Sequence, residues 1–380
     1  MNCIINRITL FLWLIIGVTG TIVAQFSDTS FLKIAFAGDI MGHDGQITGA
    51  FVDSTGEYDY EPTFRYVKPY LKSVDIAIAN LEVTLAGPPY KGYPQFSSPD
   101  NLALEANKAG FNVLVTANNH SLDRGTKGFA RTIEVLDSLK IIYTGTFKNE
   151  DARNSDYPLL IEKNNMLLAI LNYTYGTNGI TIAPPSIVNR IDTAMIRADL
   201  EKARLANPDF IFVTIHWGTE YERNENREQQ RLAEFMIRKG ADAVIGSHPH
   251  VVQPVKLYFP DKSDSAKFNI IVYSLGNFVS NQRAQYKDGG IIFEVNLMKT
   301  NGYTSVAGYN YMPVWVYRQD KNQKSTFFIL PADLYNGNID FFKFSDHDRY
   351  KISQFYNDTR QHLLSIPENR FYSDYLLPAE

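Results

Sequence analysis

The residues best suited to chemistry are histidines, because five of the seven in the chain lie in short segments that follow apolar runs. Two of them, His248 and His250, stand two residues apart just after the apolar run 241–245. Imidazole is the commonest metal ligand among side chains, and open α/β sheets build their sites at the carboxyl ends of strands. The other three histidines of this kind are His43, His120 and His216. Their shared position favours one site over five separate structural roles.

Oxygen ligands follow other apolar runs. Asp39 comes after the run 32–37, and Glu82 follows the run 75–79, two residues after Asn80. Divalent cations such as zinc, manganese or iron bind imidazole nitrogen together with carboxylate and carbonyl oxygen. A bound cation polarises a phosphoryl or carbonyl oxygen and activates water. The pattern therefore predicts a metal-type site, with a further histidine free to act as a general acid.

Taken singly, each of these residues also has a structural interpretation. His216 at the end of a strand is typical of a hydrogen-bonded histidine, and Asp39 beside Gly38 is typical of a tight turn. Glu82 at a strand end is typical of a solvated carboxylate, and we expect residues 275–277 to be structural. It is the concentration of histidines in these segments that favours the metal site.

The apolar runs alternate with amphipathic stretches, which predicts α/β layers with a largely parallel sheet. Expected strands are residues 32–37, 75–79, 112–116, 167–172, 210–215, 241–245, 269–273 and 290–295, and expected helices are 101–108, 129–139, 196–206 and 229–239. After residue 299 a Tyr- and Phe-rich alternation predicts strands in 303–317 and 325–330, followed by a helix in 346–364. We therefore expect a main domain over residues 31–298 and a β-rich C-terminal extension over residues 299–380 that ends in a helix.

The first residues have the pattern of a secretory signal peptide. Arg7 is the only charged residue before Asp28, and residues 8–23 are nearly all apolar. This pattern predicts a signal peptide over residues 1–24 and a secreted or periplasmic protein. The alternative is a membrane tether through an uncleaved signal anchor. The only cysteine, Cys3, lies in this segment, so thiol catalysis and cysteine–zinc sites are excluded in a mature chain.

Seven short strings stand in an order that resembles the CapA family, the capsule-synthesis proteins associated with poly-γ-glutamate. The strings are residues 38–41, 80–82, 117–125, 173–178, 216–221, 240–251 and 273–278. The resemblance covers roughly residues 33–295. The family in turn resembles calcineurin-like metallophosphoesterases. That resemblance implies a four-layer α/β sandwich of metallophosphatase type, with two sheets flanked by helices and one or two metal ions at the strand ends.

The resemblance also implies six metal ligands in two sites that share one bridging carboxylate. The first ion would be bound by Asp39, Glu82 and His250, and the second by Glu82, Asn119, His216 and His248. The implied cofactor is one or two divalent ions of manganese, zinc or iron.

Two further residues would act on the substrate. His120 would donate a proton or hold an anionic oxygen, and Asp123 would orient it. The chain departs from the wider pattern at Met41, where metallophosphoesterases usually carry a histidine two residues after the first aspartate. A thioether is a poor ligand for hard cations. His43 lies two residues farther along, so the first site lacks one ligand whereas the second has a full set.

Three functions are compatible with these residues. The leading one is a secreted or periplasmic metal-dependent hydrolase or transferase for capsule or other exopolymer production, working with membrane-bound capsule-synthesis machinery. Its substrate would be a phosphoester or an amide of an anionic polymer. The second is a non-catalytic exopolymer-binding or assembly component with an aromatic platform of Tyr90, Tyr93, Phe96 and Tyr175. The third is a general periplasmic metallophosphatase. A formal charge of −4 provides no basic footprint for nucleic acid.

Overall fold

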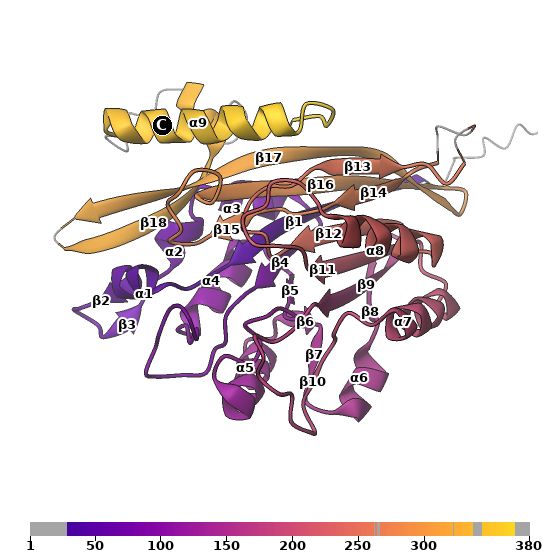
Figure 1. Cartoon of the computed structure of the whole chain (residues 1–380), viewed down its shortest axis with the longest axis horizontal. Helices are drawn as coiled ribbons and strands as arrows, with labels where there is room; N and C mark the ends of the chain where they lie inside the picture. The colour runs from indigo at the N-terminus through magenta and orange to yellow at the C-terminus, as the bar shows by residue number, and fades with distance from the viewer. Residues whose placement is uncertain (1–28, 262, 264–266, 322, 337–343, 369–380) are drawn as a thin grey trace, which may run out of the picture.

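The computed structural model describes residues 29–261, 263, 267–321, 323–336 and 344–368. Two β-sheets pack face to face in this part of the chain, and helices cover their outer faces (Figure 1). The expected signal peptide, residues 1–24, lies outside the described residues. Among those described, no helix has the length and apolar character needed to cross a membrane.

The first sheet has the strand order β18-β17-β16-β1-β4-β5-β6, and β15 also pairs with β1. Strands β1, β4, β5 and β6 are parallel, whereas β16, β17 and β18 are added as antiparallel strands. The strands are β1 (Thr29–Ile40), β4 (Ile76–Leu81), β5 (Val113–Val115), β6 (Ile142–Thr144), β15 (Asn277–Val279), β16 (Gly289–Thr300), β17 (Tyr303–Lys321) and β18 (Lys324–Pro331).

The second sheet has the order β13-β14-β12-β11-β9-β8, with a parallel centre and antiparallel edges. Its strands are β8 (Leu159–Lys163), β9 (Met166–Thr174), β11 (Phe210–His216), β12 (Ala243–Ser247), β13 (Val255–Tyr258) and β14 (Asn269–Val272). Two short pairs complete the strands, β2 (Phe51–Val52) with β3 (Glu57–Tyr58) and β7 (Thr146–Phe147) with β10 (Ile187–Val188).

Side-chain alternation along β1 explains why the sheets pack together. Successive side chains in a strand point to opposite faces. Ile34 and Phe36 enter the core between the two sheets, where the ring of Phe36 lies 4.9 Å from that of Phe212 in the second sheet. Ala35 and Ala37 face the helices instead, and their small size lets those helices approach closely.

Each sheet carries its own helical layer. Beside the first sheet lie α2 (Glu61–Phe64), α3 (Lys68–Ser73), α4 (Asn101–Ala109) and α5 (Gly125–Ser138). Beside the second lie α6 (Glu150–Asp156), α7 (Thr193–Leu205) and α8 (Arg227–Arg238). Helix α1 (Asp44–Ala50) follows β1. The four-layer α/β sandwich is therefore confirmed.

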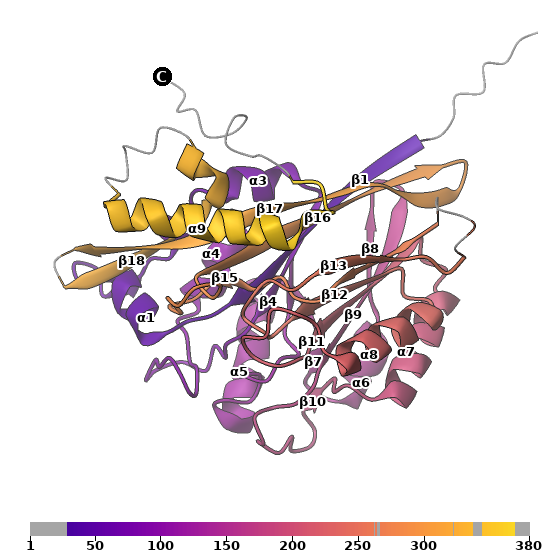
Figure 2. The same cartoon turned by 45° about the horizontal axis from the view of Figure 1, so that its top comes forward.

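The described C-terminal residues are β-rich and include the helix that the sequence predicts. Strands β17 and β18 continue the first sheet, and α9 (Asp346–His362) lies across them (Figures 1 and 2). The 3-10 helix η1 (Ala332–Asn336) follows β18 and precedes α9 in the chain. Phe355 and Tyr356 of α9 pack with Trp315 and Tyr317 of β17. The Ser345 side chain accepts the backbone N–H of Asp348 and caps the helix.

Candidate metal centre

The ends of strands from both sheets bring the site residues together. Asp39 lies in β1 and Glu82 directly follows β4, both from the first sheet. His216 ends β11 and His248 directly follows β12, both from the second sheet. All four side chains are buried. Parallel strands present their carboxyl ends at one edge, so the two sheets meet there with their polar residues facing each other.

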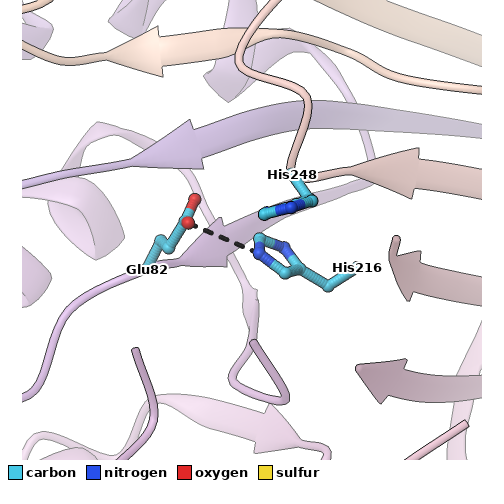
Figure 3. A group of neighbouring side chains, drawn as sticks. All are labelled: Glu82, His216 and His248. Atoms are coloured by element: carbon cyan, nitrogen blue, oxygen red, sulfur yellow. Dashed lines mark ion pairs between the residues drawn. The ribbon is translucent and has the colours of Figure 1, made fainter. Parts of the chain in front are cut away.

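One group consists of Glu82, His216 and His248, whose ligand atoms all lie within 4.8 Å of one another. Figure 3 shows the carboxylate of Glu82 directed at the two imidazoles, which approach from the other sheet. Glu82 Oε1 is 3.4 Å from His216 Nε2. The side-chain oxygen of Asn119 is 2.8 Å from the same nitrogen. The four residues expected to hold the second ion are therefore neighbours.

A second group consists of Asp39, Glu82 and His250, again with ligand atoms within 4.8 Å. Asp39 Oδ2 is 3.1 Å from His250 Nδ1, and Glu82 Oε1 is 3.9 Å from His250 Nε2. Glu82 thus belongs to both groups, which is the position that the resemblance assigns to a bridging ligand. The ligand roles of the single residues stay predictions.

Two buried polar atoms in this centre lack a hydrogen-bond partner, namely Glu82 Oε1 and His248 Nδ1. A buried polar atom without a partner costs about 1–3 kcal/mol. Both atoms belong to residues whose chemistry suits a divalent cation. The residues present therefore fit a metal ion, which would satisfy groups that the protein alone leaves unsatisfied.

Burial shifts the titration of these groups strongly. Burial, reinforced by the neighbouring Asp39, raises the pKa of the Glu82 carboxyl well above its ordinary value. Burial also lowers the pKa of His216 well below its ordinary value, with His248 and His250 contributing. Neutral imidazole is the form that binds metal. The electrostatic environment thus keeps His216 in the neutral form that binds a cation, and a cation would stabilise the ionised form of Glu82.

Hydrogen bonds fix which nitrogen of His250 faces the centre. His250 Nδ1 is 3.1 Å from the side-chain oxygen of Asn277. The amide nitrogen of Asn277 donates to the backbone oxygens of His250 and Lys287, so its orientation is set. Because that amide oxygen accepts, we assign the proton of His250 to Nδ1. Nε2 then keeps its lone pair on the side of Glu82.

A pair of asparagines holds the Asp39 carboxylate in place. Asn80 Nδ2 donates to Asp39 Oδ1 over 2.8 Å. Asn118 Nδ2 in turn donates to Asn80 Oδ1 over 3.1 Å and to the backbone oxygen of Leu81 over 2.8 Å. Such outer partners orient metal ligands. The turn expected at Gly38 is absent, because β1 continues through this residue. A glycine is needed there because a Cβ would lie 1.8 Å from the backbone oxygen of Gly276.

His120 and Asp123 form a hydrogen-bonded pair beside the centre. His120 Nδ1 is 2.7 Å from Asp123 Oδ2, and the same oxygen accepts the backbone N–H of Phe96 over 2.7 Å. The Phe96 ring packs edge-on against the imidazole, with centroids 4.7 Å apart. A cleft of about 330 Å³ opens at this pair, and its lining includes Tyr93, Asn119, His120, Asp123, Asn178 and Glu220. The arrangement suits an imidazole held in one orientation beside a substrate.

Comparison with known proteins shows the family to which the chain belongs. The family model described as "Bacterial capsule synthesis protein PGA_cap" matches residues 33–282. The chain belongs to this family. It is 32% identical to the capsule biosynthesis protein CapA of Bacillus anthracis over 275 residues, 69% of this chain and 63% of that protein. It is 29% identical to the PGA biosynthesis protein CapA of Bacillus subtilis (strain 168) over 282 residues, 68% of this chain and 66% of that one. The match spans slightly less than two thirds of both relatives.

Two solved structures that match this chain have distant sequences. The calcineurin-like phosphoesterase YfkN from Bacillus subtilis is 14% identical with a TM-score of 0.45, covering 89% of this chain and 98% of that one. A phosphatase from Mycoplasma pneumoniae is 14% identical with a TM-score of 0.41, covering 75% and 94%. Both TM-scores are below 0.5, so the fold assignment of this family member rests on the sheet order and the layers described above.

This family member departs from the metallophosphoesterase pattern at Met41, as the sequence indicated. Met41 is buried in the hydrophobic cluster between the first sheet and its helices, and it belongs to neither ligand group described above. His43 begins α1, where its backbone N–H donates to Gln46 and its Nδ1 accepts the backbone N–H of Asn281. His43 is therefore committed to the helix terminus and does not replace the missing ligand.

The predicted aromatic platform needs a correction. Phe96 is fully buried behind His120, so it cannot face a polymer. Tyr93 is 68% exposed and lines the cleft, and the ring of Tyr175 lies 4.6 Å from that of His248. Only Tyr93 and Tyr175 among these residues stand at the edge of the centre with substantial exposure.

Sequence reasoning gave no role to two residues that the structure places at the centre. Asn277 lies in the segment expected to be structural, yet its side chain contacts His250. Glu220 lies in one of the strings that carry the resemblance, and its carboxylate groups with His248 and His250. Each residue was in a segment already singled out, but the pairing depends on how two loops meet in space.

Proposed function

We propose that this protein is a metal-dependent hydrolase or transferase that serves the production of capsule or another exopolymer. The observation that carries the proposal is the buried carboxylate of Glu82, which is shared by two histidine-containing groups and left without a hydrogen-bond partner at Oε1. Membership of the capsule synthesis family and the names of the two Bacillus relatives support the capsule context.

The residues divide into a metal-binding part and a proton-transfer part. Asn119, His216 and His248 would hold one divalent ion, Asp39 and His250 would hold another, and Glu82 would contact both. A bound divalent ion polarises a phosphoryl or carbonyl oxygen and lowers the pKa of a water ligand. The Asp123 carboxylate engages Nδ1 of His120, which leaves Nε2 for the substrate. His120 would then donate a proton to the departing group or hold an anionic oxygen.

The proposed substrate is a phosphoester or an amide in an anionic polymer, met outside the cytoplasm. The residues that would hold the metal ions, together with the imidazole of His120, would suit a substrate on which negative charge develops at a phosphoryl or acyl oxygen. The signal-peptide pattern of residues 1–24 supports a secretory route for this chain. Membrane-bound capsule-synthesis machinery is the partner that this location would provide.

Metal content and turnover together test this proposal. Purified protein should contain a stoichiometric divalent metal by elemental analysis and should release product from a capsule polymer or a phosphoester panel. His216→Ala should lose turnover, because His216 Nε2 faces both Glu82 and Asn119. The exposed histidine His347 offers a matched control, since His347→Ala should retain full turnover. Protein without stoichiometric metal would contradict the proposal.

A second candidate is a non-catalytic component that binds the polymer, and the packing of Met41 favours it. With Met41 in the hydrophobic cluster, the Asp39 group offers three protein ligands and no histidine from that position. Polymer binding that survives both His120→Ala and His216→Ala, with no turnover in the unaltered protein, would support this candidate. Activity on simple phosphomonoesters or diesters, supplied with manganese, zinc or iron, would instead indicate a general phosphatase.

A further inference from the structure

Glu220 stands on the open side of the candidate centre. It lies on the segment between β11 and α8, and its carboxylate, with His248 and His250, forms a group whose ligand atoms lie within 4.8 Å of one another. Both imidazoles are buried, whereas Glu220 is exposed and lines the cleft beside His120. The ligand set implied by the family resemblance does not contain this residue.

Backbone hydrogen bonds fix Glu220 next to the two histidines. The backbone N–H of Tyr221 donates to the oxygen of Pro249 over 2.8 Å, and that of Trp217 donates to the oxygen of Ser247 over 3.1 Å. These bonds run the Glu220 segment alongside residues 247–249. Farther on, the side chain of Gln253 donates to the backbone oxygens of residues 222 and 224. The approach of Glu220 to the histidines is therefore a property of the fold.

Three non-glycine residues around this contact have left-handed backbone conformations. The φ angles are +69° at Tyr221, +100° at His248 and +57° at His250. Each such conformation costs about 1 kcal/mol or more for a residue with a side chain. Strained backbone of this kind clusters at ligand sites, where the surrounding structure holds it in place. Both facing segments are bent at the point where they present their ligand atoms.

The histidines have capacity for another contact. His248 is 4% exposed, and its Nδ1 has no hydrogen-bond partner. His248 belongs to the Glu82–His216 group on one side and to the Glu220–His250 group on the other. His250 is likewise shared with the Asp39–Glu82 group. Glu220 therefore lies beside the two histidines that also belong to the buried ligand groups, and His250 joins it to the Asp39–Glu82 group.

We propose that Glu220 is a metal ligand that completes the first site, in compensation for the histidine that Met41 replaces. This inference rests on the proposed metal-dependent function and adds a ligand to it. The first ion would then have the carboxylates of Asp39, Glu82 and Glu220 with one imidazole. Oxygen-rich sites suit manganese, whereas imidazole-rich sites suit zinc or iron. The first site should therefore favour manganese more strongly than the site at His216 and His248 does.

Calorimetric titration of metal-free protein with Mn²⁺, combined with electron paramagnetic resonance of the bound ion, tests this inference without an activity assay. Glu220→Gln keeps the side-chain shape and removes the charge. It should weaken one Mn²⁺ site by at least about 10–100-fold, because loss of even an outer partner of a ligand has an effect of that size. Glu222→Gln on the same exposed segment is the matched control and should leave both sites unchanged.

The outcomes separate this inference from the proposed function. His216→Ala should weaken the other site, so the two variants should affect different steps of the titration. If Glu220→Gln binds Mn²⁺ with unaltered stoichiometry and affinity, the role of Glu220 is overturned and the metal centre stands. If the unaltered protein binds no Mn²⁺, Zn²⁺ or Fe²⁺, the role of Glu220 and the proposed metal-dependent function are both overturned. Equal melting temperatures of the metal-free Glu220→Gln and Glu222→Gln variants would show that folding is intact.

Discussion

Glu82 is the one carboxylate shared by the two buried ligand groups of the centre. Its carboxylate is fully buried, lies near the Asp39 carboxylate and leaves Oε1 without a hydrogen-bond partner. A buried charge without a partner destabilises a fold, whereas the same charge binds a cation strongly in low dielectric. Stability of the metal-free protein and affinity for metal should therefore change in opposite directions when this charge is removed.

Glu82→Gln tests that opposition. We expect the variant to unfold, when metal-free, with a free energy about 1–3 kcal/mol higher than that of the unaltered protein, because an amide costs less to bury. Its affinity for Mn²⁺ or Zn²⁺ should fall at both sites. Urea denaturation in chelator and calorimetric titration measure the two effects. The exposed Glu57 gives a control, since Glu57→Gln should change neither quantity. A metal-free Glu82→Gln variant less stable than the unaltered protein would contradict the prediction.

Asp242 provides a pH-dependent residue away from the centre. Its carboxylate accepts the backbone N–H of Ile211 at the start of the second sheet, and burial raises its pKa to about 6. In the unfolded chain an aspartate titrates near pH 3.9. The folded state therefore holds this proton more tightly, so the group's stabilising contribution is full below about pH 4 and is lost as the pH rises through 6.

Asp242→Asn should remove this dependence. We expect the variant to be more stable than the unaltered protein at pH 8, by up to about 3 kcal/mol, and nearly equal at pH 4. The amide oxygen can still accept the Ile211 N–H. Urea denaturation of both proteins from pH 4 to pH 8 gives the difference at each pH, in which other titrating groups cancel. A difference that stays constant across this range would count against the raised pKa.

The meeting of most of these residues at one centre could be predicted from the sequence, because each follows a long apolar run. Asp39, Glu82, His216 and His248 stand at the ends of central strands, and a strand end is visible in sequence. Glu220 is different, because its partners are set by the Tyr221–Pro249 backbone bond between two loops. A backbone contact of that kind leaves no pattern of residue types. The contact of Asn277 with His250 could not be predicted for the same reason, because only the fold brings the two residues together.

Among the elements, length decided what could be predicted. The strands around residues 32–37, 167–172 and 210–215 and the helix around 229–239 appear where expected, because each has a sustained apolar period. Strand β15 has only three residues, so its sequence is too short to show the apolar–polar alternation that indicates a strand. Strand β8 is mostly exposed along Leu159–Lys163, and its position at the sheet edge explains its weak signal.

Helix α9 connects the C-terminal part to the loops of the centre. His362 Nε2 is 2.9 Å from the backbone oxygen of Arg223, and the Arg223 side chain donates to the backbone oxygen of Asp358 over 3.2 Å. Gln285 also donates to the Asp358 carboxylate over 2.8 Å. The segments that carry Glu220 and follow Asn277 are therefore both held by one helix. Helix α9 therefore contacts both of these segments.

His362→Ala should loosen the segment that carries Glu220. Loss of the bond to the Arg223 oxygen removes one of its anchors, so amide hydrogen exchange across residues 217–226 should accelerate. Affinity for the ion near Glu220 should fall several-fold, and the site at His216 should change less. His347 is exposed on the same helix, so His347→Ala is the matched control. Unchanged exchange in residues 217–226 would show that α9 does not hold this segment.

In the whole molecule the centre lies on the boundary between the two sheets. Asp39 and Glu82 come from the first sheet, whereas His216, His248 and His250 come from the second. The sheets otherwise meet through apolar packing such as that of Phe36 and Phe212. An ion bound by residues of both sheets is a link across this boundary. Metal binding should therefore report on the stability of the whole sandwich.

Metal removal should lower the melting temperature of the entire described fold in one transition. A ligand that binds only the folded state stabilises it by about 2.7 kcal/mol when present at 100 times its dissociation constant. We expect chelator to remove this increment and Mn²⁺ or Zn²⁺ to restore it. His216→Ala should lose most of the increment, whereas His347→Ala should keep it. A link that exists only in the folded state must raise the free energy of unfolding. If calorimetry shows bound metal but the melting temperatures with and without chelator are equal, the ion does not join the two sheets.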